Sequence, residues 1–428
     1  MRPGGVLPPG WDHGAVSAVE VRATVEAAFR IESARIIAAV TRIVRDVGIA
    51  EELAQDALVA ALEQWPEAGV PDRPGAWLTA AARRRAIDLV RRREVYARKL
   101  AEAGRELADV PPVEVGDAED IDDDLLRLMF TACHPVLAAE ARIALTLRLL
   151  GGLTTGEIAR AYLAPEPTVA QRIVRAKRAL AKAAVPFEVP YGADRQERLA
   201  SVLEVVYLVF NEGYSATAGA DLVRPALCEE AMRLARVLAG LMPGEPEVHG
   251  LVALLELQAS RLAARTGAGG EPVLLADQNR QRWDRLLIHR GLSALERAGT
   301  GPYSIQAAIA ACHARAARYE DTDWAAIAVL YGGLMMVAPS PVVELNRAVA
   351  LSMAEGPAAG LAVADQLTGV AALRDYHLLP SVRGDLLARL GRVEEARAEL
   401  ERAAALTRNE RERELLLAKA HGLGLQRG

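Results

Sequence analysis

An acidic stretch that contains prolines divides the chain and lies between two basic blocks. Residues 106–124 hold nine carboxylates and no basic residue, and they include Pro111 and Pro112. This composition favours a solvated connector over a packed element. We therefore expect a flexible acidic linker over 99–121, with separately folded domains before and after it.

Composition predicts that these domains are helical. The chain has 428 residues, of which 51% are hydrophobic and 4% aromatic, so several cores are expected. Ala, Leu, Arg and Glu dominate, and alternating β-branched runs are scarce. The expected fold class is all-α, with two small helical domains, the second holding a helix-turn-helix, and an α-helical, repeat-like C-terminal domain.

Prolines, glycines and helical periodicity set the expected boundaries. Apolar residues at helical spacing predict one helix before residue 45 and a second over about 49–65, and a third begins near Trp77 after a loop at 66–75. The expected segments are a disordered tail over 1–17, a helical domain over 18–98, the linker over 99–121, a second helical domain over 122–184, and a helical extension over 191–428.

Several classes of protein are disfavoured by what the chain lacks. Cys133, Cys228 and Cys312 are widely separated and odd in number, which disfavours a disulfide framework and a zinc site. Neither a signal peptide nor a run of 18 apolar residues is present. We expect a cytoplasmic protein that has no membrane contact, metal or cofactor.

The first of two basic blocks coincides with the predicted third helix. From Trp77 to Arg105 the chain has nine Lys or Arg residues against three Asp or Glu. A row of arginines binds phosphates through planar forks of donors, with steep salt dependence. The candidate DNA-binding residues are Arg83, Arg84, Arg91 and Arg92. The plainer alternative is a solvated helix face on which Asp88 pairs with Arg84 and Arg92.

The second basic block, from Ala139 to Lys182, has eight basic residues against three acidic ones and reads as a helix-turn-helix. Thr154 and Glu157 have the spacing of a capping box, and Pro167 suits the first position of the next helix. On that helix Val169, Ile173, Ala176 and Leu180 are expected to face inward. The outward candidates for reading bases are Thr168, Gln171, Arg172, Arg175 and Lys177. A plain helical hairpin is the alternative.

Three motifs in this order resemble a known family. They are Ala50-Glu-Glu-Leu-Ala-Gln-Asp56, the stretch from Trp77-Leu to Arg91-Arg92, and the stretch from Gly152-Leu-Thr through Pro165-Glu-Pro-Thr-Val169 to Arg175-Ala176. Together they are similar to domains two and four of the extracytoplasmic-function sigma factors, over about residues 20–184. The rest of the chain, including Phe210-Asn-Glu-Gly-Tyr-Ser215, is similar to the subgroup with a long helical C-terminal extension.

The resemblance implies partners and roles by position. Core RNA polymerase is the implied partner, through its β′ clamp helices and β flap, with promoter DNA as the second partner. The residues implied in polymerase binding are Glu52, Gln55, Asp56 and Val59, and their plainer alternative is a solvated surface. The loop at 66–75 is implied to capture a flipped base of the minus-ten element, a step that costs only a few kcal/mol at an opened strand. The helix from Pro167 is implied to read the minus-thirty-five element, and the acidic linker to pass near the RNA path.

Some positions depart from the family's common pattern. Arg84 stands where Asn is frequent, Leu163 where the turn usually has Gly, and Pro167 where Gly often precedes Thr-Val. These departures concern the preferred promoter sequence more than the function.

The extension contains a repeat-like pattern and no recognisable active site. Two segments share a helix, a Gly turn and a second helix, with Gly356 and Gly391 35 residues apart, close to the tetratricopeptide period. Scattered groups such as Glu212, Asp277, His289 and His313 lack the fixed spacing of metal ligands or catalysts. We expect a non-enzymatic sigma factor whose extension regulates it in cis through a protein or small-molecule signal. The alternative is a helix-turn-helix activator with a tetratricopeptide sensor.

Overall fold

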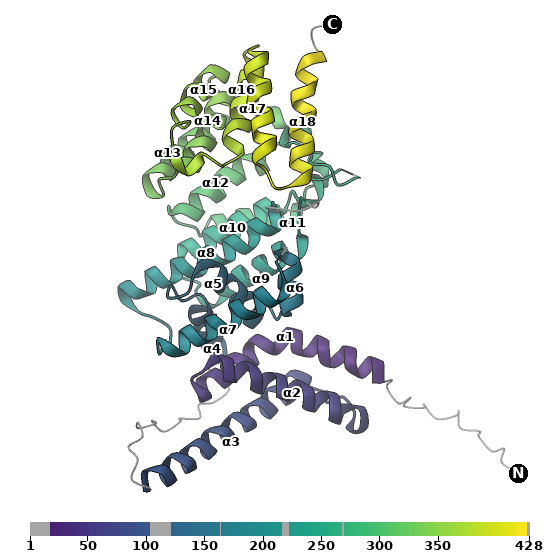
Figure 1. The fold of residues 1–428 in the computed structure, drawn as a ribbon, viewed down its shortest axis with the longest axis vertical. Coiled ribbons are helices and arrows are strands. Elements are labelled where there is room, and N and C mark those ends of the chain that lie inside the picture. The colour runs from purple at the N-terminus through teal and green to yellow at the C-terminus, as the bar shows by residue number, and fades with distance from the viewer. Residues whose placement is uncertain (1–17, 103–120, 163, 216–221, 268, 426–428) are drawn as a thin grey trace, which may run out of the picture. The chain divides into compact units, whose positions relative to one another are not determined.

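The computed structural model describes residues 18–102, 121–162, 164–215, 222–267 and 269–425 (Figure 1). Within these ranges the regular elements are α-helices and short 3-10 helices, and an isolated bridge joins Thr266 to Pro272. The expected all-α fold is confirmed. The tail over 1–17 and most of the acidic linker lie outside the described residues. No helix in the described ranges is long and apolar enough to cross a membrane.

Two compact units account for the contacts of the chain. The first, unit 1, contains the residues up to Ala132 together with 145–154 and 174–190. The second, unit 2, contains 133–144, 155–173 and everything from Tyr191 onward. The segment expected as a helix-turn-helix domain, 122–184, therefore contributes residues to both units.

Unit 1 begins with three long helices and a shorter one: α1 (Ala18–Val44), α2 (Val47–Ala68), α3 (Pro74–Glu102) and α4 (Ile121–Ala132). Helix α1 packs against the other three, and its buried side chains include Val25, Ile36 and Val40. The carboxylate of Asp46 starts α2 by accepting the backbone N–H groups of residues 48 and 49 at 2.7 and 3.0 Å.

Two helix boundaries differ from the sequence-based expectation. Helix α2 continues through Pro66 to Ala68, and Gly69, with a φ of +83°, ends it by donating its N–H to the Trp65 carbonyl. Helix α3 begins at Pro74, three residues before Trp77, because the fixed φ of proline suits the first turn of a helix.

The helix-turn-helix segment contains α5 (Ala139–Leu149), α6 (Thr155–Ala161) and α7 (Glu166–Lys182). Helix α7 begins one residue before Pro167, so this proline lies in the first turn, where its missing N–H costs nothing. The Pro165 carbonyl accepts the N–H groups of Thr168 and Val169 at 3.0 and 3.2 Å, which closes the turn onto α7.

The extension consists of further helices, most of them packed against their neighbours in sequence, while α12 packs mainly against α10 (Figure 1). They are α8 (Gly192–Tyr214), α9 (Pro225–Leu241), α10 (Pro246–Ala259), α11 (Arg285–Leu295), α12 (Pro302–Arg315), α13 (Trp324–Val337), α14 (Pro341–Ala354), α15 (Pro357–Gln366), α16 (Leu378–Arg389), α17 (Val393–Leu406) and α18 (Glu410–Leu425). Successive helices bury apolar side chains against one another, which forms clusters along the extension.

Glycines make the turns of the two repeat-like segments. Gly356 lies between α14 and α15 with a φ of +105°, and Gly391 lies between α16 and α17 with a φ of +76°. These backbone angles strain any residue with a Cβ atom. Both segments therefore fold as the expected helix, Gly turn and helix, while their membership of the tetratricopeptide class stays a prediction.

Candidate nucleic-acid interface

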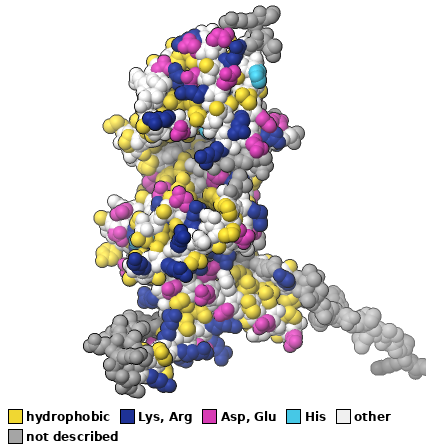
Figure 2. All heavy atoms as spheres, viewed as in Figure 1, with side chains coloured by type: hydrophobic (Ala, Val, Ile, Leu, Met, Phe, Trp, Pro, Cys, Tyr) yellow, Lys and Arg dark blue, Asp and Glu magenta, His cyan; other side chains and the backbone are white. Residues whose placement is uncertain are grey.

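Helix α3 separates an apolar side from a cationic side. Leu78, Ala82 and Ala86 are fully buried at helical spacing. The candidate residues Arg84, Arg91 and Arg92 are exposed, as is the neighbouring Arg93, whereas Arg83 is half-buried. Lys and Arg side chains gather along this helix in Figure 2.

Arg84 and Arg92 of α3 are not neutralised by Asp88 of the same helix. Among the described residues no ion pair joins Asp88 to Arg84 or Arg92, although i,i+4 spacing allows both. The side chain of Arg85 instead donates to the carbonyl of Ala81 at 3.3 Å. The face of α3 thus keeps an excess of positive charge in solvent, which is the electrostatic requirement for binding a polyanion.

An exposed aromatic ring near the end of α3 was not identified from the sequence. Tyr96 has 66% of its surface exposed, and Val95 next to it has 44%. Arg91, Arg92 and Lys99 lie around these two side chains. An exposed ring among cations suits stacking on an unpaired base. This residue could have been found from the sequence as a tyrosine within a basic segment, five residues after Arg91.

Two tryptophans fix the start of α3 against the end of α2. The rings of Trp65 and Trp77 meet edge to face, with centroids 5.4 Å apart and planes at 73°. Trp65 is only 2% exposed, so it anchors the contact, whereas Trp77 is half-buried. This packing holds the two ends of the loop over 69–73, which lies within the segment for which the resemblance implies base capture.

Helix α7 divides its faces as the sequence predicts. Val169, Ile173, Ala176 and Leu180 are all buried. Of the five outward candidates, Thr168, Gln171 and Arg175 are exposed, whereas Arg172 and Lys177 are half-buried. The exposed residues reach the first turn of the helix, where recognition helices contact base edges.

Lys177 is occupied within unit 1. Its ammonium forms an ion pair with Glu51, and the same carboxylate accepts a hydrogen bond from Arg148 Nε at 2.6 Å. Gln55 Nε2 also donates to Glu51, at 2.9 Å. Glu51 is 5% exposed, so one buried carboxylate ties α2 to α5 and α7. This contact could not be predicted from the sequence, because Glu51, Arg148 and Lys177 come from distant segments.

The candidate polymerase-binding residues lie on the part of α2 next to this carboxylate. Glu52, Asp56 and Val59 are exposed, and Val59 leaves 51% of an apolar side chain in solvent. Gln55 is half-buried because it bonds to Glu51. Three of the four candidates thus form an accessible, mixed acidic and apolar surface.

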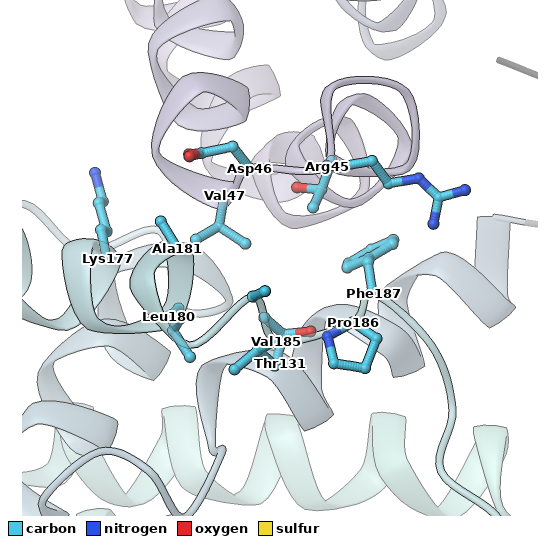
Figure 3. Close-up of a pocket in the computed structure, with 12 residues that line it drawn as sticks. Arg45, Asp46, Val47, Thr131, Lys177, Leu180, Ala181, Val185, Pro186 and Phe187 are labelled. Atoms are coloured by element: carbon cyan, nitrogen blue, oxygen red, sulfur yellow. The ribbon is translucent and has the colours of Figure 1, made fainter. Parts of the chain in front are cut away.

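A cavity of about 360 Å³ lies beside the same helices in unit 1 (Figure 3). Figure 3 shows Arg45, Asp46 and Val47 on one side of it and Leu180, Val185 and Phe187 on the other. Two of its charged groups already have partners, since Asp46 caps α2 and Lys177 pairs with Glu51. The cavity therefore presents little chemistry for holding a ligand.

Within unit 2, the start of the extension contacts residues of the helix-turn-helix segment. Ser201 of α8 donates to the carbonyl of Cys133 at 2.5 Å, and Arg142 of α5 pairs with Glu204 of α8 at 2.9 Å. Arg224, just before α9, donates both to the carbonyl of Ala161, the last residue of α6, and to the carboxylate of Glu212.

This contact is buried. The side chain of Arg224 is 14% exposed and that of Glu212 is 10% exposed. Burial, followed by the charge of Glu212, raises the pKa of the nearby Tyr162, the residue after α6. Helix α9 also approaches α8 closely at the Phe210–Ser215 motif, where a Cβ atom on Gly213 would lie 2.7 Å from the backbone nitrogen of Cys228.

The described residues hold no group of three His, Cys, Asp or Glu side chains placed to bind a metal ion. Cys133 and Cys228 are buried and form no disulfide, and burial raises the pKa of the Cys228 thiol to about 12. A thiol with so high a pKa stays protonated and is a poor nucleophile.

Comparison with known proteins assigns families to three segments. Residues 29–95 match Sigma-70 region 2, and residues 127–180 match Sigma-70, region 4. Residues 198–299 match a family of unknown function, DUF6596. The first two matches fall on the segments that carry the cationic face of α3 and the helix-turn-helix.

Similar proteins fall into two groups. An uncharacterized protein of Rhizobium meliloti (strain 1021) is 48% identical over 381 residues, which cover 87% of this chain and 89% of the relative. The ECF RNA polymerase sigma factor SigK of Mycobacterium sp. (strain KMS) is 32% identical over 143 residues, or 32% of this chain and 72% of SigK. SigK of Mycolicibacterium vanbaalenii is 31% identical over 153 residues, or 35% of this chain and 76% of that protein. The SigK proteins thus match about a third of the chain.

Proposed function

Because the chain belongs to the ECF RNA polymerase sigma factors, a non-enzymatic family that acts with core RNA polymerase and promoter DNA, we propose that it directs initiation at promoters with minus-ten and minus-thirty-five elements. The observation that carries this proposal is the pair of exposed surfaces on α3 and α7, which come from the two sigma regions. An activator that works outside the holoenzyme has no use for a second, strand-contacting domain.

In this proposal each surface has its own role. Arg84, Arg91 and Arg92 contact phosphates of the opened minus-ten strand, and Tyr96 stacks on one of its bases. Thr168, Gln171 and Arg175 face the major groove of the minus-thirty-five element. Glu52, Asp56 and Val59 bind the β′ clamp helices of the polymerase. Lys177 joins the DNA contacts only when its ion pair with Glu51 is broken.

Transcription by purified core polymerase and this chain tests the proposal. Mapping transcript starts on genomic DNA is expected to yield one pair of elements upstream of each start. The double variant Arg91→Gln, Arg92→Gln is expected to lower output about tenfold and to reduce the salt slope of DNA binding by about 2. The double variant Arg285→Gln, Arg290→Gln, which changes two exposed arginines on α11, is the charge-matched control. Random starts, or equal effects of both variants, would contradict the proposal.

We further infer that the extension regulates the sigma regions in cis. The support comes from Arg224 and Ser201, which join the extension to backbone carbonyls of the sigma region four segment within unit 2. A ligand or protein that shifts α8 and α9 would thereby act on α6, the helix that precedes the recognition helix. A coupling free energy of about 1–3 kcal/mol is typical of such linked sites.

The variant Arg224→Gln tests this coupling. It is expected to change promoter-dependent transcription at least about fivefold without changing the affinity for core polymerase, because only the contact to α6 and Glu212 is lost. Arg236→Gln is the matched control, since Arg236 also pairs with a buried carboxylate, Glu256, at 2.7 Å but entirely inside the extension. If both variants change transcription equally, general destabilisation of the extension explains the result and the regulatory coupling is absent.

A further inference from the structure

Unit 2 contains three guanidinium groups linked through two aromatic rings. The Cζ atom of Arg265 lies 3.9 Å from the ring centre of Tyr214, and that of Arg261 lies 5.8 Å from the same ring. Arg261 also lies 5.7 Å from the ring of Trp283, above which Arg280 sits at 4.6 Å. The three charges therefore share one small region where α8 and α10 end.

None of these three arginines has a carboxylate partner. In the part of the chain that the structure describes, no Asp or Glu oxygen lies within 4.0 Å of them, whereas many other arginines of unit 2 have such a pair. Arg261 bonds to neutral groups, Tyr214 Oη at 2.5 Å and Gln258 Oε1 at 3.0 Å. Arg280 bonds to the carbonyls of His313 and Ala316 at 2.5 and 2.7 Å.

Glu412, whose pKa the charge of Arg265 helps to lower, has other partners. Glu412 accepts a hydrogen bond from Thr407 at 2.9 Å and pairs with His377 at 3.2 Å. Burial acts to raise the pKa of Glu412, but hydrogen bonds from His377 and Thr407 outweigh it, and the charges of His377 and Arg265 also help to keep that pKa low. The Nε atom of Arg265 is buried and has no hydrogen-bond partner among the described residues.

The pKa values of neighbouring groups reflect this concentration of positive charge. Burial, followed by the charge of Arg261, lowers the pKa of the Arg280 guanidinium, and the charges of Glu320 and Asp321 offset this only in part. Burial and the charges of Arg261 and Arg280 also lower the pKa of His313 to about 4, so that the imidazole is neutral at pH 7. Holding like charges together away from water is unfavourable, and an anion bound there relieves the repulsion.

We propose that Arg261 and Arg265, grouped around Tyr214, bind a doubly charged oxyanion such as the phosphate group of a small molecule. Guanidinium forks match the oxygens of phosphate, and the unpartnered Nε of Arg265 supplies a donor that no protein group uses. Tyr214 holds both side chains in place, so that little rotamer entropy is lost on binding. Arg280 adds charge at longer range while remaining fixed to α12.

The site deepens the proposed regulation, because Tyr214 belongs to the helix that also carries Ser201 and Glu212. Its role as a signal input therefore rests on the proposed function. Anion binding itself does not, since it is measured on the full chain without DNA or polymerase.

Thermal unfolding and calorimetric titration with inorganic phosphate test the site. At constant ionic strength, phosphate is expected to raise the Tm of the full chain, sulfate to act similarly, and acetate and chloride to have no such effect. Arg265→Gln is expected to weaken phosphate binding at least about tenfold, the consequence of losing a charge-assisted contact. Arg265→Lys keeps the charge but loses the planar fork of donors, so its phosphate affinity is expected to lie between those of the unmodified chain and Arg265→Gln. Arg285→Gln is expected to bind like the unmodified chain.

Two outcomes would overturn the proposal. One is a phosphate effect no larger than that of chloride, and the other is equal binding by the unmodified chain and Arg265→Gln. A folded Arg265→Lys protein with unchanged affinity would exclude recognition by the fork. Phosphate binding without any change in transcription would leave the site in place and remove only its regulatory role.

Discussion

At the scale of single residues, two side chains occupy a backbone conformation that favours glycine. Arg45 has a φ of +58° and Ala184 a φ of +46°, and they are the only non-glycine residues with positive φ in the described ranges. Both follow a helix, at positions where the left-handed conformation closes the last turn. Ala184 donates its N–H to the carbonyl of Ala181 at 3.1 Å, and Val185 donates to Leu180 at 3.2 Å.

We expect Ala184→Gly to stabilise the protein by about 0.5–1 kcal/mol, because relief of the left-handed strain exceeds the added entropy of the unfolded chain. Ala184 is exposed, so removing its Cβ atom sacrifices no packing. Ala183→Gly is the matched control, since Ala183 is also exposed but does not have a positive φ, and we expect it to be neutral or destabilising. Denaturant unfolding of the two variants measures the difference. A loss of stability in both would show that the turn is not strained.

At the scale of helices, the carboxylate of Glu51 acts as a junction for α2, α5 and α7. We expect Glu51→Gln to lower the free energy of unfolding by about 2–4 kcal/mol, because it leaves Arg148 and Lys177 without their shared counter-charge. Glu52→Gln, on the exposed side of α2, is expected to change it by less than about 0.5 kcal/mol. Urea unfolding provides the measurement.

A double-mutant cycle with Lys177→Met separates the ion pair from other effects. A coupling energy near zero between positions 51 and 177 would show that the pair does not form in solution. A clear coupling would explain why Lys177 contributes less to DNA binding than Arg175, its exposed neighbour on α7.

Much of the helical architecture was predictable, because burial on one face leaves a period in the sequence. The buried set on α7 and the glycine turns at Gly356 and Gly391 follow directly from residue type. The expected end of α2 was wrong by a few residues, because Pro66 predicted the end of the helix but lies in its last turn. Contacts such as that of Arg224 with the Ala161 carbonyl could not be predicted, because every residue has a backbone carbonyl and the sequence does not mark which one is bound.

At the scale of the whole molecule, the extension and residues 133–144 and 155–173 share one compact unit. Removing everything after Ala184 would expose the carbonyls of Cys133 and Ala161 and leave Arg142 without Glu204. Loss of activity in such a truncated chain would report damage to the sigma region as readily as lost regulation. Point changes such as Arg224→Gln address the coupling without that ambiguity.

The contacts that join α8 and α9 to the sigma region four segment bear on whether the extension can be attached to another sigma factor. Ser201 and Arg224 bind main-chain oxygens, so these two contacts do not depend on which side chains stand at positions 133 and 161. The side chain of Arg142 differs, since it pairs with Glu204 and also donates to Ser201 Oγ. We therefore expect an arginine at the equivalent of position 142 to be one requirement for attaching the extension to a shorter sigma factor.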